Sequence, residues 1–80
     1  MKITLLAFGI AKDILGQRQV AIEVPDGLQV SGLLAHLGEQ YPDFKDLASL
    51  RVAVNEEYAQ ADHPISPADE IVLIPPVSGG

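Results

Sequence analysis

One amphipathic stripe constrains the fold of this chain more than any other feature of its sequence. Between residues 30 and 41, apolar side chains recur at i, i+3, i+4, i+7 and i+11, a spacing that predicts one helix with a single apolar face. Pro42 follows directly and ends that helix. Because a helix of this kind can cover only one face of a sheet, the rest of the chain must supply the sheet. The stripe consists of Val30, Leu33, Leu34, Leu37 and Tyr41.

Short runs rich in apolar and β-branched residues surround this helix, and we expect them to form the strands of the sheet. In one of them Val20, Ile22 and Val24 alternate with more polar residues, which is the pattern of a half-buried strand. The sequence IAKDILG, which ends at Gly16, predicts one short helical turn. The predicted strands are residues 2–8, 19–24, 50–54, a short 58–60, and 70–74, with turns at 25–27, 55–56 and 66–69.

The predicted helix has weak local signals and must be held mainly by packing. Gly32 and Gly38 lie inside it, and each costs about 1 kcal/mol relative to alanine. Gln29 stands at the expected cap position and is a poor capping residue, so Ser31 is the better candidate for that role.

The element order predicts an α+β protein with the β-grasp arrangement. In that arrangement a mixed sheet of four to five strands packs on one main helix, and the first and last strands are neighbours. We expect residues 1–80 to form one domain, with residues 75–80 as an extended tail. The first and last strands are apolar on both faces. The face away from the helix is therefore either an exposed patch for a partner or covered by loops, and the sequence favours neither alternative.

Composition excludes several classes of function. The chain has 80 residues, no cysteine and a formal net charge of −6. Disulfides and thiolate metal sites are therefore excluded, and an acidic chain is a poor match for nucleic acid. No apolar run approaches the roughly 20 residues of a membrane span and no leader sequence opens the chain. We expect a cytoplasmic protein that binds neither nucleic acid nor membrane.

No set of residues in the sequence has the pattern of an active site. His36 and His63 lack metal-ligand spacing, and they are interpreted as a solvated helix residue and a turn residue. The serines stand without a nucleophile elbow, and no glycine-rich loop opens a helix. We therefore expect no catalytic residue, no metal site and no bound cofactor on this chain.

The C-terminal segment is the remaining candidate for function. Pro75 and Pro76 favour an extended exit from the last strand, and residues 75–80 can reach about 20 Å. Gly79 and Gly80 form a tip without side chains, which a narrow channel can admit. Such a tip offers its carboxylate for activation by the ATP of another enzyme. The alternative is an ordinary frayed terminus.

The sequence resembles the small subunits of molybdopterin synthase, which are MoaD-like sulfur carriers of the ubiquitin-like ThiS/MoaD family. The resemblance extends over the whole chain, and its most specific part is the C-terminal sequence PPVSGG after DEIVLI. The matching pieces are AVN at 53–55, DHPI at 62–65, DEI at 69–71 and PPVSGG at 75–80, together with Phe8, Lys12, Asp13 and Gly16 in the opening segment.

The resemblance implies a ubiquitin-like β-grasp protein whose terminal Gly80 is adenylated by a ubiquitin-activating-type adenylyltransferase at the expense of ATP. A sulfur donor protein then converts the adenylate to a thiocarboxylate. The carrier that bears the thiocarboxylate docks on the large synthase subunit, which holds the catalytic residues. Two rounds of sulfur transfer convert cyclic pyranopterin monophosphate to molybdopterin. The family also implies a heterotetramer of two small and two large subunits.

The residue patterns and the resemblance together suggest two further roles for residues of this chain. The tail, formed by Pro75, Pro76, Val77, Ser78 and Gly79, is expected to thread the active site of the large subunit. Phe8 and Ile74 are the candidates for docking contacts, because both stand on the apolar face that the helix leaves open.

Three other functions stay open at this point. A carrier for another pathway, such as thiazole synthesis, also ends in Gly-Gly. An activated Gly80 is also able to form an isopeptide bond with a lysine, as a protein modifier does. The chain is otherwise a plain interaction module with an inert tail.

Overall fold

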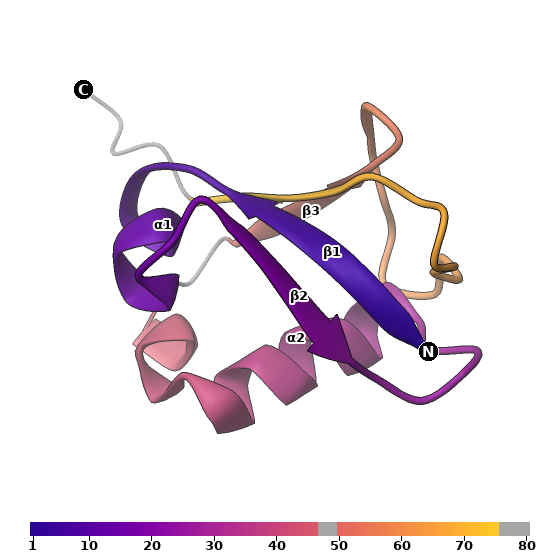
Figure 1. Cartoon of the computed structure of the whole chain (residues 1–80), viewed down its shortest axis with the longest axis horizontal. Helices are drawn as coiled ribbons and strands as arrows, with labels where there is room; N and C mark the ends of the chain where they lie inside the picture. Colours follow the sequence, from indigo (N-terminus) through magenta and orange to yellow (C-terminus); the bar gives the residue numbers. More distant parts are fainter. Residues whose placement is uncertain (47–49, 76–80) are drawn as a thin grey trace.

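The computed structural model describes residues 1–46 and 50–75, and within them the predicted α+β class is confirmed. A mixed five-stranded sheet has α2 along one face, and α1 lies at the end where β1 finishes (Figure 1). The elements are β1 (Lys2–Ala7), α1 (Gly9–Leu15), β2 (Gln19–Glu23), α2 (Val30–Gln40), the 3-10 helix η1 (Pro42–Asp46), β3 (Arg51–Val54), β4 (Glu57–Tyr58) and β5 (Ile71–Ile74).

The strand order in the sheet is β2-β1-β5-β3-β4. The first and last strands are neighbours, as predicted. They run parallel at the centre of the sheet, with Leu5 opposite Ile71 and Ala7 opposite Leu73. Every other pair is antiparallel. Because β1 and β5 are parallel, both finish at the same edge of the sheet, which we call the exit edge.

The core lies between the sheet and α2. Alternate residues of β1 and β5 point into it, and Ile3, Leu5, Ile71 and Leu73 are fully buried. From α2 the core receives Val30, Leu33 and Leu37, three members of the predicted stripe. The two faces of the sheet thus differ, since one is sealed by α2 and the other is not.

The start of α2 is held by a distant loop and not by a side chain. Gln29 is the N-cap residue and makes no side-chain cap hydrogen bond, so the prediction that Ser31 caps the helix is wrong. Instead, the backbone N–H of Val30 donates to the carbonyl of His63 at 3.0 Å, and that of Ser31 donates to Ala61 at 2.9 Å. These bonds satisfy donors that every helix N-terminus leaves free.

Several predicted boundaries shift by one or two residues. The first strand ends at Ala7 because Phe8 is the N-cap residue of α1, and Tyr41 is the C-cap residue of α2. The short fourth strand lies at 57–58 and not at 58–60, because a two-residue turn precedes it. Asn55 and Glu56 both have positive φ, at 53° and 72°, the geometry of a tight hairpin that pairs Val54 with Glu57. The third and fifth strands begin one residue later than predicted.

None of the helices in residues 1–46 and 50–75 has the length and apolar character needed to cross a membrane.

Candidate functional site

The last strand delivers the chain to the exit edge from the middle of the sheet. β5 is hydrogen-bonded between β1 and β3, and Ile71 and Leu73 anchor it in the core. Pro75 follows and is the last residue that the structure describes. The predicted tail residues Pro76, Val77, Ser78, Gly79 and Gly80 lie outside the described residues. What the fold shows is therefore where the tail begins.

The face of the sheet opposite α2, which we call the outer face, carries apolar side chains across four strands. The register places Leu6 of β1, Val72 of β5, Ala53 of β3 and Tyr58 of β4 side by side. Leu6 and Val72 are half-buried, and Tyr58 is 66% exposed. A shallow hollow of about 310 Å³ on this face is lined by Ala53, Glu56, Tyr58, Glu70, Val72 and Ile74.

Phe8 and Ile74, the two predicted docking residues, both lie at the exit edge. Ala7 and Leu73 are paired in the sheet, and Phe8 and Ile74 are the residues that directly follow them. Phe8 is 48% exposed and Ile74 is half-buried. Gly9 has a φ of +56°, and a Cβ at this position would stand 3.4 Å from Cγ of Pro75. The loop that carries Phe8 therefore packs against the start of the tail.

Arg51 and Tyr58 extend the outer face beyond the two residues that the sequence identified. Arg51 is opposite Ile74 in the sheet, and its guanidinium carbon lies 5.4 Å from the centre of the Tyr58 ring, a cation–π contact. Sequence reasoning missed both residues because their positions depend on the pairing of β3 with β5 and of β4 with β3. The available signal was the alternation of Arg51 and the small Ala53 with the larger apolar Val52 and Val54.

A hydrogen-bond network fixes the other end of β5. The side-chain amide of Asn55 donates to Asp69 Oδ1, and its carbonyl oxygen accepts from the backbone N–H of Glu70, both at 2.9 Å. The backbone N–H of Asn55 also donates to the carbonyl of Glu70 at 2.8 Å. The hairpin turn and the residues just before β5 are thereby joined, which sets the register of the strand that leads to the tail.

The backbone N–H of Ser66 donates to Asp69 Oδ2 at 2.9 Å. This bond, followed by the one from the Asn55 amide, holds the pKa of Asp69 below its ordinary value of 3.8. The carboxylate is a structural acceptor in a loop and lies at the end of β5 away from the exit edge.

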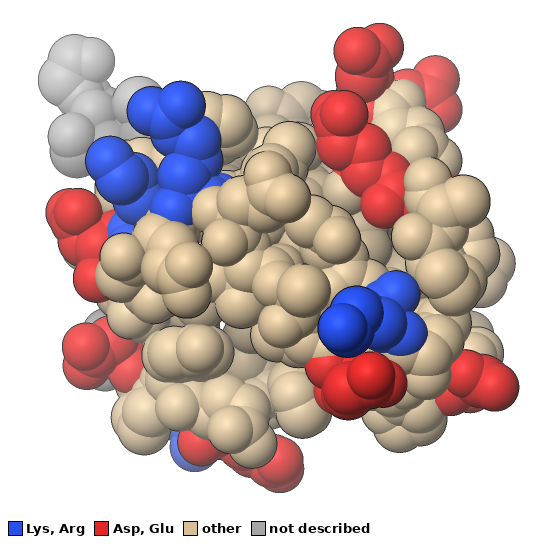
Figure 2. Space-filling view, in the orientation of Figure 1, with Lys and Arg blue, Asp and Glu red and all other residues tan. Residues whose placement is uncertain are grey.

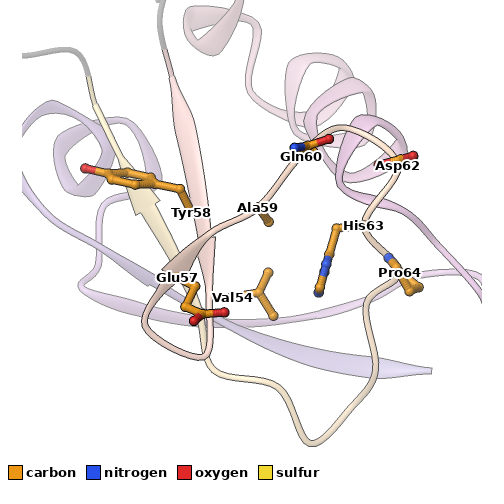
Figure 3. A pocket seen from close by; sticks show the side chains of 8 residues that line it. All are labelled: Val54, Glu57, Tyr58, Ala59, Gln60, Asp62, His63 and Pro64. Atoms are coloured by element: carbon orange, nitrogen blue, oxygen red, sulfur yellow. The ribbon is translucent and has the colours of Figure 1, made fainter.

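The hollow drawn in Figure 3 lies between the β3–β4 hairpin and the loop that caps α2. His63 and Val54 point into the same space, whereas the ring of Tyr58 is turned away from them (Figure 3). Within the described ranges, no group of three or more His, Asp or Glu side chains is arranged to hold a metal ion. The backbone carbonyl of His63 accepts a hydrogen bond from the N–H of Val30, the first residue of α2, which agrees with the predicted role of His63 as a turn residue.

The chain matches the model of the ThiS family over residues 5–80. It is 31% identical over 81 residues to the molybdopterin synthase sulfur carrier subunit of Arabidopsis thaliana, covering 100% of this chain and 84% of that protein. To the protein of the same name from Dictyostelium discoideum it is 35% identical over 80 residues, covering 95% of this chain and 93% of the relative.

The solved structures that are similar to this fold include the following two. A putative molybdopterin converting factor, subunit 1, from Pyrococcus furiosus has a TM-score of 0.86 at 24% identity, over 96% of this chain and 99% of that one, and confirms the β-grasp fold. The second, from Helicobacter pylori, is a complex of subunits 1 and 2 of molybdopterin-converting factor. Its matching chain has a TM-score of 0.68 at 26% identity, with both chains covered completely.

Proposed function

This chain belongs to the ThiS family, and on that premise we propose that it is the sulfur carrier of molybdopterin synthesis. Its relatives in Arabidopsis and Dictyostelium carry the name of that subunit, which favours this pathway over thiazole synthesis. The observation that carries the proposal is the position of β5. It leads from the centre of the sheet to the exit edge, beside an open apolar face.

The proposed chemistry takes place at the carboxylate of Gly80. An adenylyltransferase of the ubiquitin-activating type joins this carboxylate to AMP from ATP and releases pyrophosphate. Hydrosulfide supplied by a sulfur donor protein then attacks the acyl carbon of the adenylate, so that a C–S bond forms, the bond to AMP breaks, and a thiocarboxylate is left. This chain contributes the carboxylate and the reach of its tail, and ATP is bound by the activating enzyme.

We further propose that the outer face docks on the large synthase subunit and directs the tail into that subunit's active site. Two subunits of the related factor form a complex in Helicobacter pylori, which supports a partner of this kind. The apolar row from Leu6 to Tyr58 supplies the contact area, and Phe8 and Ile74 are placed next to the first tail residue, Pro75. In this scheme the large subunit provides the catalytic residues that convert cyclic pyranopterin monophosphate.

The length of the tail tests this proposal. Adding one glycine after Gly80 moves the carboxylate by about 3.5 Å, which is enough to separate reacting atoms in a fitted site. We expect this variant to lose sulfur transfer to cyclic pyranopterin monophosphate, measured as molybdopterin formed with the activating enzyme, sulfur donor and large subunit. Gln60→Ala changes a side chain in an exposed loop and leaves the tail and its length unaltered, so it serves as the control and is expected to retain transfer. Full transfer by the lengthened chain contradicts a role for the terminal carboxylate.

A further inference from the structure

β2 leaves one row of backbone groups without a partner in the sheet. Within residues 1–46 and 50–75, β2 pairs only with β1. The backbone N–H of Ala7 donates to Arg18, and that of Val24 donates to Met1, both at 2.8 Å. Because hydrogen-bonded positions alternate in an antiparallel pair, residues 18, 20, 22 and 24 face β1. The N–H and C=O groups of Gln19, Ala21 and Glu23 therefore point to the free side.

The sheet edge formed by β2 carries few of the features that usually prevent strands from pairing, since Glu23 is its one charged residue. Proteins protect edge strands with lysine, proline or bulges, and none of the five residues of β2, QVAIE, is lysine or proline. Below the strand, a hollow of about 300 Å³ is lined by Ile22, Glu23, His36, Leu37, Gln40 and Tyr41. Figure 2 views the molecule from the side on which β2 lies, and there uncharged residues occupy the centre while most charged residues lie around the rim. This distribution is typical of a protein interface.

We propose that a second copy of this chain pairs with β2 along this edge, antiparallel and about a two-fold axis at Ala21. In this register Ala21 faces Ala21 of the second copy, and Gln19 faces its Glu23. The free N–H and C=O groups of Gln19, Ala21 and Glu23 then form hydrogen bonds across the interface in both copies. This is possible because Gln19 and Glu23 lie two residues on either side of the axis at Ala21. The two sheets become one continuous sheet.

The side chains of this register are also complementary. On the outer face, the Gln19 amide stands opposite the Glu23 carboxylate of the second copy, so a donor meets a charged acceptor twice. Glu23 lies 4.0 Å from the N-terminal ammonium of Met1, and its side chain is 75% exposed, so the carboxylate stays accessible to the second copy. On the helix side, Val20 stands opposite Ile22 of the second copy, and the half-buried Ile22 becomes covered. An axis at Glu23 would instead place two carboxylates directly opposite each other, which is unfavourable.

This pairing is independent of the proposed sulfur-carrier function. β2 is an outermost strand of the sheet, two positions from β5, so the exit edge beside Pro75 and the apolar row on the outer face stay accessible. The interface is small and belongs to the transient class. We therefore expect a monomer–dimer equilibrium that depends on protein concentration.

Sedimentation equilibrium of the full chain, from about 10 μM to about 1 mM, tests the pairing in the range where small interfaces associate. Gln19→Lys places a cation opposite Glu23 of the second copy twice and should tighten the dimer roughly two- to thirtyfold. Gln19→Glu places like charges there and should weaken it. Gln60→Lys, which adds the same charge in an exposed loop, is the matched control for net charge and should leave association close to that of the unaltered chain.

Ala21→Pro separates pairing from folding. The N–H of Ala21 points away from β1, so proline removes no hydrogen bond inside the monomer but removes the central bonds of the dimer. We expect this variant to unfold cooperatively on heating and to stay monomeric at every concentration. A monomer at all concentrations for both the unaltered chain and Gln19→Lys overturns the proposal. So does a dimer that persists in folded Ala21→Pro, because association then uses another surface.

Discussion

At the scale of single residues, Asn55 and Asp69 show how side chains determine where the functional strand lies. Asn55 adopts a positive φ that asparagine tolerates better than most residues, and its amide bonds to two residues just before β5. The sequence predicted the two turns that contain these residues. It did not predict that they bond to each other, because 14 residues separate them and only the sheet brings them together.

The lowered pKa of Asp69 predicts a specific dependence of stability on pH. A carboxylate with a lowered folded-state pKa stabilises the fold above its unfolded pKa, and this stabilisation is lost as pH falls through the folded value. The free energy of unfolding should therefore exceed that of Asp69→Asn at pH 7, and the difference should shrink as pH falls below the ordinary value of 3.8. Urea unfolding at a series of pH values measures this difference.

Asp62→Asn provides the control for that series, since it removes the same charge from an exposed loop position. A difference between the unaltered chain and Asp69→Asn that stays constant from pH 7 to acid would contradict the structural role of the Asp69 carboxylate.

At the scale of elements, two glycines in similar sequence contexts have opposite conformational needs. Gly38 lies inside α2, and a Cβ there would meet the Lys45 side chain at 3.5 Å, an ordinary contact. Gly16 is the C-cap residue of α1 with a φ of +80°, which side chains rarely adopt. The sequence predicted both helices. Whether a substitution at each glycine raises or lowers the free energy of unfolding, however, depends on backbone geometry.

Gly38→Ala should raise the free energy of unfolding by about 0.5–1 kcal/mol, because alanine favours the helix and fits the space. Gly16→Ala should lower the free energy of unfolding by about 1–2 kcal/mol. There is room for the added methyl group, but alanine must adopt a left-handed backbone conformation that is unfavourable for a residue with a side chain. Urea denaturation of both variants measures the pair, each serving as the control for the other. Shifts of the same sign would show that space and conformation do not decide the outcome.

Local sequence signals did not predict every feature of the helices and strands. Periodicity predicted α2 from Val30, but not how its N-terminus is satisfied, since the acceptors are backbone carbonyls of residues 61 and 63. Because these acceptors are backbone carbonyls, which every residue has, they cannot be recognised from the identity of the side chains. The tight turn at 55–56 likewise brings β4 forward by one residue, which composition alone does not reveal.

At the scale of the whole molecule, the exit edge joins an apolar face to the start of the tail. Phe8 and Ile74 were predicted as docking residues from the alternation of apolar side chains in two strands. Their proximity to each other and to Pro75 follows from the parallel pairing of β1 with β5. Arg51 and Tyr58 belong to the same face but were not predicted, because strand order cannot be obtained from periodicity.

The proposed docking role of the outer face predicts the effect of charge at the exit edge. Phe8→Asp and Ile74→Asp should each weaken binding to the large subunit by about 2 kcal/mol or more, the value of a buried anchor at an interface centre. Binding can be measured by calorimetry. Phe8 is half exposed and occupies a helix cap position, where aspartate is favourable, so its variant should remain folded.

Gln40→Asp adds the same charge at the end of α2, on the opposite side of the sheet, and should bind as the unaltered chain does. Equal affinity of all these variants would show that the outer face is not the docking surface.

The proposed sulfur-carrier role of Gly80 can be tested by the intact mass of the chain after incubation with its activating enzyme, ATP and a sulfide source. We expect a gain in mass equal to sulfur replacing one oxygen, located at Gly80 by fragmentation, as evidence for this role. An unchanged mass, with an activating enzyme shown to be competent on another carrier of the family, would contradict it.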